Sequence, residues 1–439
     1  MKLSLEWMFS VSLPPGRGLL PFLDRSKFLV TLCQILTKLP RAASRRRHLN
    51  HSLQRSHMSQ IDIERDLDRH EMIRATARQF ADREIRPVAA DLDETEKFPA
   101  GIYEAMAKLG MFGITVPDEL GGAGADAVSY AYVMEELSRG YASIADQCGL
   151  VELVGTLLAT HGTAGQQQQY LRPLLAAKRR CAYAITEAEA GSDVSGIKTT
   201  ATETPDGWTL SGGKLWIHNA PVADFAVVLA RTAPELGKRG MSIFIVDKDQ
   251  PGYRIGRHEH KMGQRASQVG ALHFDDIKLP KTALLGPLNR GFHMMMSVLD
   301  KGRVGIAALA VGILQGALEA SVAQAKERRQ FGQAIAEFQA VQWMLADMAK
   351  DVHAARLMTH DAAAKLDRGE RATTECSMAK CFAADAAVAH TANAVQIHGG
   401  MGYIRGMEVE RLYRDAKITQ IYEGTNQIQR MLIARQLLA

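Results

Sequence analysis

Residues 208–218 read WTLSGGKLWIH, and apolar and polar residues alternate on both sides of the glycine pair. An alternation with a period of two is typical of a strand that is buried on one face. Gly212-Gly213 is a turn signal, so we expect strands over 208–211 and 214–218 joined by a hairpin turn. A second turn signal, Pro205-Asp206-Gly207, precedes them. This stretch therefore predicts a sheet in the middle of the chain.

Three more short segments share this character. Residues 225–230, 241–246 and 272–277 are rich in β-branched or aromatic side chains. No segment long enough for a helix separates them, which indicates antiparallel pairing. Between about 181 and 290 we therefore expect an antiparallel β domain, either a barrel or a sandwich.

Helical periodicity flanks this region on both sides. Before it, Ile73, Ala77 and Phe80 recur at spacings of four and three, and Pro87 is expected to end that helix. After about residue 291 the helical spacing returns and holds, with few helix breakers before Gly399-Gly400, which is typical of a helical bundle.

The order of these patterns predicts an α+β fold for the 439 residues. We expect an N-terminal all-α domain at 58–180, a middle antiparallel β domain at 181–290 and a C-terminal helical bundle at 291–439. A basic extension at 1–57 precedes them, and we expect it to be disordered.

The basic charge of the chain is confined to that extension. The whole sequence has a formal net charge of +5, whereas residues 1–57 hold ten Lys and Arg against two Asp and Glu, which leaves −3 for the rest. A body near neutrality lacks the electrostatic footprint of a protein that binds nucleic acid. The longest apolar run of the extension, Phe28 to Leu36, is too short to cross a bilayer, so no membrane span is expected.

Two interpretations of residues 1–57 remain open. The segment is Arg-rich, acid-poor and contains Ser, as a mitochondrial transit peptide does, which would place the mature protein in the mitochondrial matrix. Alternatively, it is upstream sequence read through from an early start codon, because a helical, well-charged pattern begins just after Met58. A bacterial protein starting there would be cytoplasmic, and we favour this second interpretation.

Several common sites are missing from the sequence. Gly400-Met401-Gly402 is followed by Arg405 where a dinucleotide fingerprint needs glycine, and no GxxxxGK[ST] loop or GxSxG elbow occurs. His258-Glu259-His260 lacks the spacing at which two histidines on one helix face bind zinc. No metal site is therefore predicted.

Two stretches near the predicted strands offer groups to a ligand. Residues 183–196, YAITEAEAGSDVSG, place hydroxyls and glycines in a loop whose N–H and Oγ atoms could hold a phosphate or a ring carbonyl; a plain polar connector is the alternative. Trp216 and His218 share one face of the strand because strand residues alternate. The indole could lie beside a planar cofactor or pack in the core.

The last stretch supplies a carboxylate next to a helix start. Residues 414–427 read RDAKITQIYEGTNQ, and Thr425 is a natural N-cap for a terminal helix that runs to Leu438. Glu423 then lies just ahead of that helix. It is either a surface acid that complements the helix dipole or a general base projected from a turn.

Five motifs together resemble those of the acyl-CoA dehydrogenase family of flavoproteins, of the short- and medium-chain type. They are the TEAEAGSDVSG loop at 186–196, KLWI at 214–217, RRQFG at 328–332, QIHGG at 396–400 and IYEGTNQIQ at 421–429. Each is weak alone, but they occur in the family's order from about residue 61 to the end. The family fold is an α-helical domain, a small β domain and a C-terminal helical bundle, the order predicted above.

The resemblance implies that the chain binds FAD between the β domain and the bundle. Thr186 and Ser192 resemble the hydroxyl donors of the loop that holds flavin and pyrophosphate. Arg328 and the 396–400 segment resemble contacts made across a subunit interface, so a homotetramer, a dimer of dimers, is implied. The residues that match the family's FAD contacts are Tyr183, Thr186, Gly191, Ser192, Trp216, Ile217, His218, Arg328, Phe331, Gln339, Gln396, Gly399, Gly400, Thr425 and Gln427.

The reaction implied by the resemblance is α,β-dehydrogenation of an acyl-CoA thioester to the trans-2-enoyl-CoA. Glu423 matches the family's base, which removes the pro-R α-proton while the β-hydride passes to flavin N5. The enolate is stabilised at the thioester oxygen by the base residue's own N–H and a ribityl hydroxyl. Burial would raise the pKa of the carboxyl from about 4.3 toward the working pH. The resemblance also implies substrate contacts at Ser192, Asp300, Arg303 and Gly424, and electron-transfer flavoprotein as the acceptor.

Three positions bear on this assignment. His218 stands where members usually have a Thr or Ser that bonds flavin N5; the imidazole could donate the same bond, tune the flavin by its charge, or only fill space. Ala188-Glu189 replaces the usual Pro-Gly of the loop, which alters its rigidity. Some relatives carry their base on the first bundle helix, where this chain has Gly302, and this supports Glu423 as the base.

The predicted acyl pocket has polar residues where a pocket for a simple fatty-acyl group should be mostly apolar. The helix that lines it in relatives carries Asp146, Gln147, Gly149 and Glu152 here. An unpaired buried carboxylate is costly, so these residues predict a polar, branched or ring-bearing acyl group. The alternative is that they face solvent or a partner helix.

Three other functions remain as alternatives. One is an oxidase, in which oxygen accepts the electrons directly and which differs in solvent access. A two-component flavin monooxygenase on the same fold lacks the YEGT glutamate, so Glu423 argues against it and His218 mildly for it. A non-catalytic helical interaction module would have degenerate flavin and base motifs, whereas both persist here.

Overall fold

The computed structural model describes residues 60–439, so the predicted extension at 1–57 lies outside the described residues. Pro87 does not end the first helix as predicted. The α-helix ends at Phe80, and the chain continues through a π-helical turn, η1 (Ala81–Ile85), and a 3-10 turn, η2 (Arg86–Val88), whose first positions accept proline because no N–H is needed there. The helices of this region are α2 (Gln60–Phe80), α3 (Ala89–Thr95), α4 (Ala100–Lys108), α5 (Ala127–Gly140), α6 (Ala142–His161), α7 (Ala164–Gln166) and α8 (Arg172–Leu175).

The middle of the chain forms one eight-stranded sheet in the order β6-β7-β3-β2-β4-β5-β8, with β1 paired to β4. Pairing is antiparallel, except that β1 and one residue pair of β2 run parallel to β4. The parallel pair needs no helix because β2 and β3 themselves form the connection from β1 to β4. The strands are β1 (Cys181–Ala184), β2 (Thr200–Thr204), β3 (Gly207–His218), β4 (Phe225–Arg231), β5 (Met241–Asp247), β6 (Tyr253–His258), β7 (Val269–Pro280) and β8 (Leu284–Leu285).

The hairpin predicted at Gly212-Gly213 is wrong. Residues 207–218 form one strand, β3, which pairs with β7 and shifts its register at two places. Gly212 has a φ of +142°, and a Cβ there would lie 2.6 Å from Thr199 Oγ1. Glycine is therefore required by the close approach of a neighbouring segment at a bulge, not by a turn.

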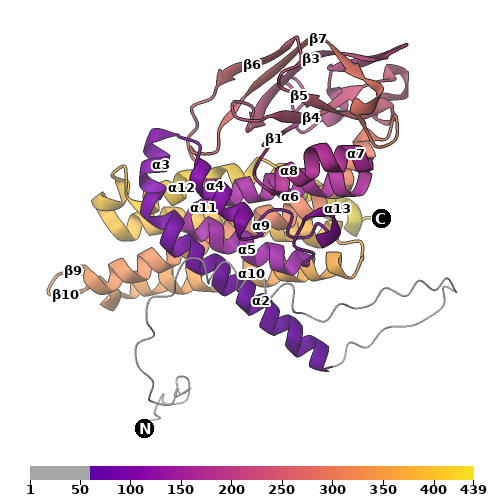
Figure 1. Ribbon diagram of the computed structural model, residues 1–439. Coiled ribbons are helices and arrows are strands. Elements are labelled where there is room, and N and C mark those ends of the chain that lie inside the picture. The colour runs from indigo at the N-terminus through magenta and orange to yellow at the C-terminus, as the bar shows by residue number, and fades with distance from the viewer. Residues whose placement is uncertain (1–59) are drawn as a thin grey trace. The chain divides into compact units, whose positions relative to one another are not determined.

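Strands β4 and β5 separate two hydrophobic cores. Val227 faces the helical core, whereas its neighbour Val228 faces a second core formed within the sheet. Trp208 on β3 packs against Phe244 on β5 with ring centroids 5.2 Å apart, although these strands are not neighbours. The sheet therefore curls around its own core, and its other face lies toward the helices (Figure 1).

After β8 the chain is helical again, with a short hairpin between the first two helices. Helix α9 is the central element, because it packs against α5 and α6 of the first region and against α10 and α11 of the last. The helices of both terminal regions thus share one core next to the sheet, as Figure 1 shows. The elements are α9 (Gly291–Glu327), β9 (Arg329–Gln330), β10 (Gln333–Ala334), α10 (Gln339–Asp367), α11 (Thr373–His398), α12 (Glu408–Lys417) and α13 (Asn426–Leu437). The order of helices, sheet and helices confirms the predicted fold class.

Helices α6 and α9 are long and apolar enough to cross a membrane, with mean hydropathies of 1.3 and 1.7 over 18-residue windows. However, 78% of the α6 window and 67% of the α9 window are buried inside the fold. A helix that is apolar on most sides is also what the core of a large helical body needs.

Candidate active site

Glu423 lies in a strained turn between the 3-10 turn η10 (Ile418–Gln420) and α13. Glu423 has a φ of +53° and Gly424 a φ of +85°, so two consecutive residues are left-handed. For a residue other than glycine this conformation costs about 1–2 kcal/mol. Thr425 caps α13 as predicted, because its Oγ1 accepts a hydrogen bond from Ile428 N–H at 3.3 Å. The helix cap thus fixes one side of the turn.

Two buried side chains hold the other side of the turn. Gln429 Nε2 donates to the carbonyl oxygens of Glu423 and Gly424 at 3.1 and 2.9 Å. Lys380 Nζ on α11 donates to Gly424 O at 2.8 Å and to Asn426 Oδ1 at 3.0 Å. Gly424 also has no room for a side chain, because a Cβ would lie 2.7 Å from Gln429 Nε2. The strained backbone is therefore held by contacts from two helices.

The Glu423 carboxyl is turned into the protein. Its Oε2 atom is buried and has no hydrogen-bond partner within the described residues. It faces α9 at Gly302, where a Cβ would come within 2.8 Å of Oε2. Burial raises the pKa of Glu423 to about 7, although the positive charges of Arg303 and Lys380 oppose the shift. A carboxyl with a pKa near neutrality is suited to accept a proton.

Three tyrosines converge on this carboxyl. Burial raises the pKa of Tyr183 on β1, Tyr130 on α5 and Tyr422, and the charge of Glu423 adds to each shift. The Tyr183 hydroxyl is buried and, in the part of the chain from residue 60 on, has no hydrogen-bond partner. Tyr130 Oη lies against α9, where a Cβ at Gly305 would approach it to 2.2 Å. Sheet and bundle thus bring unpaired polar atoms to one place, which is costly unless a ligand satisfies them.

Asp300 and Arg303, the predicted substrate contacts on α9, form an ion pair. Arg303 Nη1 donates to Asp300 Oδ1 at 2.6 Å, and Thr373 Oγ1 donates to Asp300 Oδ2 at 2.7 Å. Arg303 is only 7% exposed. The structure places its guanidinium where its charge acts on Glu423.

The sheet contributes the loop that follows β1. Glu187 anchors this loop, because its carboxylate accepts hydrogen bonds from the backbone N–H groups of residues 198–199 at 2.6 and 3.0 Å and from Lys214 Nζ at 2.8 Å. Burial lowers the pKa of Lys214 to about 8, although the Glu187 charge opposes this. The loop is thus tied to β3 at its base. Among its predicted cofactor contacts, Thr186 is half-buried, and Gly191 and Ser192 are exposed.

Trp216 and Ile217 on β3 have opposite environments. Trp216 is 60% exposed and has a φ of +56°, whereas Ile217 is buried in the core of the sheet. The indole is therefore available to a ligand instead of packing in the core. The shared face predicted for Trp216 and His218 assumed a regular strand, and the register shift between Lys214 and Ile217 interrupts that regularity.

Both ring nitrogens of His218 face protein groups. Nε2 lies 2.9 Å from Gln147 Nε2 and 2.7 Å from Ser267 Oγ, and Nδ1 lies 3.4 Å from Asp146 Oδ2. Gln147 in turn exchanges two hydrogen bonds with Asn219. Burial lowers the pKa of His218, although the charge of Asp146 opposes the shift. This network favours an indirect effect of His218 over a direct bond to a cofactor.

The polar residues of α6 that predicted a polar acyl pocket contact the protein itself. Asp146 and Gln147 belong to the network on β3. Glu152 accepts a hydrogen bond from Thr115 N–H at 3.1 Å and lies 3.8 Å from Lys301 Nζ. A polar acyl group is therefore not needed to explain these residues, although Glu152 Oε2 is buried without a partner in the described chain.

The remaining predicted cofactor contacts lie elsewhere in the chain. Arg328 and Phe331 are at the β9–β10 hairpin, Gln339 begins α10, and the exposed Gln396, Gly399 and Gly400 are at the end of α11. Phe331 is 93% exposed and has a φ of +52°. Figure 1 shows the hairpin at the end of α9 and α10 that is away from the sheet. One copy of the chain thus does not bring the hairpin residues to the loop after β1 (Figure 1). Gln427, in the first turn of α13, is exposed.

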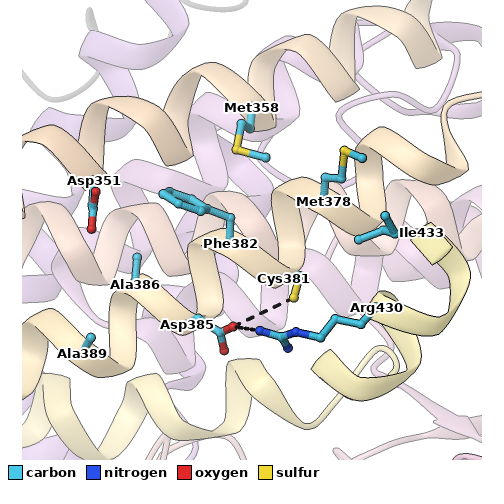
Figure 2. Close-up of a pocket in the computed structure, with 10 residues that line it drawn as sticks. All are labelled: Asp351, Met358, Met378, Cys381, Phe382, Asp385, Ala386, Ala389, Arg430 and Ile433. Carbon is cyan, nitrogen blue, oxygen red and sulfur yellow. Dashed lines mark hydrogen bonds and ion pairs between the residues drawn. The ribbon is translucent and has the colours of Figure 1, made fainter. Parts of the chain in front are cut away.

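A separate cavity of about 540 Å³ lies among α10, α11 and α13 (Figure 2). Its walls include Met358 and Phe382, and Arg430 Nη2 donates to Asp385 Oδ2 at 2.5 Å beside it. None of the predicted site residues lines this cavity. It is therefore distinct from the Glu423 site. No group of three or more potential metal-ligating side chains occurs in the part of the chain that the structure describes.

Sequence reasoning missed three residues of this site, Lys380, Gln429 and Tyr130. Lys380 and Gln429 occupy ordinary polar positions of helical segments, and Tyr130 reads as a core residue. No local signal marks Lys380 or Tyr130, because their contacts join segments that are far apart in the sequence. Gln429 ends the motif at 421–429, but the motif alone does not show which backbone groups its side chain holds. Only the packing of α5, α11 and α13 around Glu423 reveals them.

Comparison with known proteins agrees with the fold. Three family domains match the chain in order: acyl-CoA dehydrogenase, N-terminal domain over residues 68–178, middle domain over 182–277 and C-terminal domain over 289–438. The caffeyl-CoA reductase-Etf complex subunit CarC of Acetobacterium woodii is 44% identical over 84% of this chain and 98% of its own. The mitochondrial short-chain specific acyl-CoA dehydrogenase of Bos taurus is also 44% identical, over 84% of this chain and 90% of its own.

A solved structure gives the same result in three dimensions. Butyryl-CoA dehydrogenase from Megasphaera elsdenii superposes with a TM-score of 0.82 at 37% identity, covering 85% of this chain and 98% of that protein. The similarity extends over both helical regions and the sheet, as do the three family domains. The resemblance found in the sequence motifs is therefore confirmed, and the chain belongs to the acyl-CoA dehydrogenase family of oxidoreductases, which act on CH–CH bonds.

Proposed function

We propose that this protein catalyses the α,β-dehydrogenation of an acyl-CoA thioester to the trans-2-enoyl-CoA, with Glu423 as the base and FAD as the cofactor. The observation that supports this most directly is the Glu423 carboxyl, whose Oε2 atom is buried and unpaired within the described residues and whose pKa is raised to about 7. A proton next to a thioester carbonyl is weakly acidic, so its removal needs a base whose pKa lies near the working pH.

The residues on the sheet side fit a flavin. The exposed indole of Trp216 offers a surface for a planar ring, and the exposed Gly191 and Ser192 offer N–H and hydroxyl donors. The orphaned Tyr183 hydroxyl and Glu423 Oε2 leave polar atoms unsatisfied nearby. Bound FAD would supply the acceptor for a hydride and its two electrons.

A second set of residues fits the same cofactor from another subunit. Arg328, Phe331 and the 396–400 segment match the family's contacts across an interface. Arg328, Phe331, Gln396, Gly399 and Gly400 are exposed, and the β9–β10 hairpin lies away from the sheet (Figure 1). We therefore propose a homotetramer, a dimer of dimers, in which a neighbouring copy completes each FAD site.

The backbone of the turn also serves the reaction. The amide N–H of Glu423 makes no hydrogen bond within residues 60–439. It is therefore available to bond the thioester oxygen, where negative charge develops as the α-proton moves to the carboxylate. A preorganised donor at that position stabilises the transition state.

We propose electron-transfer flavoprotein as the electron acceptor. The Acetobacterium woodii relative is named as a subunit of a reductase-Etf complex, which supports this partner. The same proton and hydride positions serve the reverse reduction of an enoyl-CoA. A relative named as a reductase and one named as a dehydrogenase are equally similar to this chain, so both directions are to be assayed.

Glu423→Gln in the holoenzyme tests the proposal. The amide keeps the size of the side chain but cannot accept the proton. We expect this variant to retain FAD and to be bleached by an acyl-CoA under anaerobic conditions at least ~10²-fold more slowly than the parent. Full activity would refute Glu423 as the base. A parent protein that acyl-CoA does not bleach, and that consumes oxygen only with a separate flavin reductase, would indicate the two-component monooxygenase instead.

A further inference from the structure

Lys380 is a buried cation that the proposed reaction does not itself use. It lies on α11, has no exposed surface, and donates from Nζ to Gly424 O at 2.8 Å and to Asn426 Oδ1 at 3.0 Å. Burying an ammonium group is costly unless hydrogen bonds and nearby charges compensate. The carbonyl that it binds belongs to the residue after Glu423. The buried charge therefore acts on the turn that carries the carboxyl.

That turn depends on few contacts. Left-handed backbone at a residue such as Glu423 persists only where the surroundings impose it. Gly424 O accepts hydrogen bonds from both Lys380 and Gln429, and Glu423 O accepts one from Gln429. Lys380 is the charged member of this pair of donors. Its loss would remove both a hydrogen bond and a charge from the turn.

The charged groups around Glu423 come from several helices. Arg303 of α9 and Lys380 of α11 are positive, and Asp146 of α6 is negative. Arg303 is paired with Asp300 at 2.6 Å, whereas the hydrogen bonds of Lys380 Nζ go to neutral oxygens. The positive charge of Lys380 is thus not neutralised by a direct ion pair in the described chain. The other titratable groups facing the carboxyl are the phenols Tyr130 of α5, Tyr183 of β1 and Tyr422.

We propose that Lys380 is the positioning residue of the base: it holds the Gly424 carbonyl, and with it the left-handed turn, and its charge favours the ionised form of Glu423. The inference deepens the proposed function and rests on it, because it takes Glu423 as the base. Burial lowers the pKa of Lys380 to about 8, so the side chain is still mostly protonated where Glu423 titrates, at about 7.

Two substitutions separate the hydrogen bond from the charge. Lys380→Met keeps the length of the side chain without donor or charge, and Lys380→Gln keeps a donor without the charge. In the Met variant we expect the acidic limb of the kcat–pH profile to move up by about one unit, so that kcat at pH 7 falls about fivefold with little change in KM. The Gln variant should show the same shift with a higher kcat at alkaline pH.

A second readout follows the base without turnover. A 3-thia-acyl-CoA can lose its α-proton but cannot pass on a β-hydride, and its anion gives a charge-transfer band with bound FAD. The pH midpoint of that band reports the pKa of the base directly. We expect it to move upward by about one unit in both Lys380 variants, because an opposite charge near a carboxylate lowers its pKa.

Lys350→Met on α10 is the matched control. The Lys350 side chain is 65% exposed and pairs with Asp347 at 2.8 Å, so this variant should keep the parent profile. The proposal would be overturned if Lys380→Met kept the kcat of the parent and the pH midpoint of its charge-transfer band. If that variant does not fold, an unchanged pH midpoint in Lys380→Gln would overturn it. Failure of the proposed function itself is distinguishable, because Glu423→Gln would then keep full activity.

Discussion

At the scale of single residues, the site places one carboxyl where it is unfavourable for folding. Glu423 is left-handed, and its Oε2 is buried without a partner in the described chain. Strained backbone of this kind costs about 1–3 kcal/mol and tends to occur at functional sites. Burial also raises the pKa of the carboxyl to about 7. The same two features that weaken the fold make the side chain a usable base.

We therefore expect Glu423→Gln to gain stability over the parent as the pH rises. The ordinary pKa is 4.5 and the folded-state pKa about 7, so the unfolded chain ionises first and the parent loses stability between these values. Above pH 7 the loss is complete and amounts to about 3 kcal/mol. Denaturant unfolding of both proteins at pH 4 and pH 8 measures it. An equal difference in unfolding free energy at the two pH values would contradict the burial of this carboxyl.

At the scale of elements, other segments pack closely against α9 at positions where α9 has glycine. Gly302 lies against the Glu423 carboxyl, and Gly305 lies against Tyr130. Gly312 allows α5 to approach, because a Cβ would lie 2.2 Å from Glu135 O. Glycine inside a helix is unfavourable by about 1 kcal/mol relative to alanine. The glycines of α9 are thus explained by close packing and not by helix formation.

Gly302→Ala should separate activity from stability. The new Cβ would meet Glu423 Oε2, the end of a flexible side chain, so the helix gains propensity while the carboxyl is displaced. We expect an unchanged or higher melting temperature and a kcat lowered by up to about 10²-fold, the effect of a misplacement of roughly 1 Å. Gly101→Ala in α4, where a Cβ meets nothing within 4 Å, is the control for propensity alone. Unaltered kcat in Gly302→Ala would show that the carboxyl is not fixed there.

Sequence patterns predicted the type of most elements but not how they connect. The glycine pair at 212–213 and Pro87 were both expected to end an element. Instead, the glycine pair lies inside strand β3, and Pro87 lies inside the 3-10 turn η2. The reason is tertiary. Gly212 makes room for Thr199, and a π-helical turn takes up the backbone geometry ahead of Pro87. Local signals do not distinguish a turn from a position where another segment comes close.

At the scale of the whole molecule, the candidate cofactor residues form two groups. The loop after β1 and Trp216 lie on the sheet, whereas Arg328 and Phe331 lie at the β9–β10 hairpin, away from it (Figure 1). If a neighbouring copy completes the site, residues of the hairpin should affect FAD binding without affecting the fold of their own chain.

Arg328→Glu tests this arrangement. Arg328 is exposed, so the free energy of unfolding of the cofactor-free variant should stay within about 0.5 kcal/mol of that of the parent. We expect less FAD to be retained through gel filtration, measured as the ratio of flavin to protein absorbance. Arg368→Glu, at an exposed ion pair after α10, should retain FAD like the parent. Equal retention in both variants would argue against a shared site.

The sequence by itself determined the α+β order, the family and the identity of the carboxyl in the YEGT motif, because periodicity and short motifs are local properties. Only the tertiary structure decided what surrounds that carboxyl. Lys380, Tyr130 and Gly302 come from separate helices that are distant from Glu423 in the sequence, and they act on it through tertiary contacts. Burial and electrostatic interactions depend on distance in space, so no reading of neighbouring residues contains them.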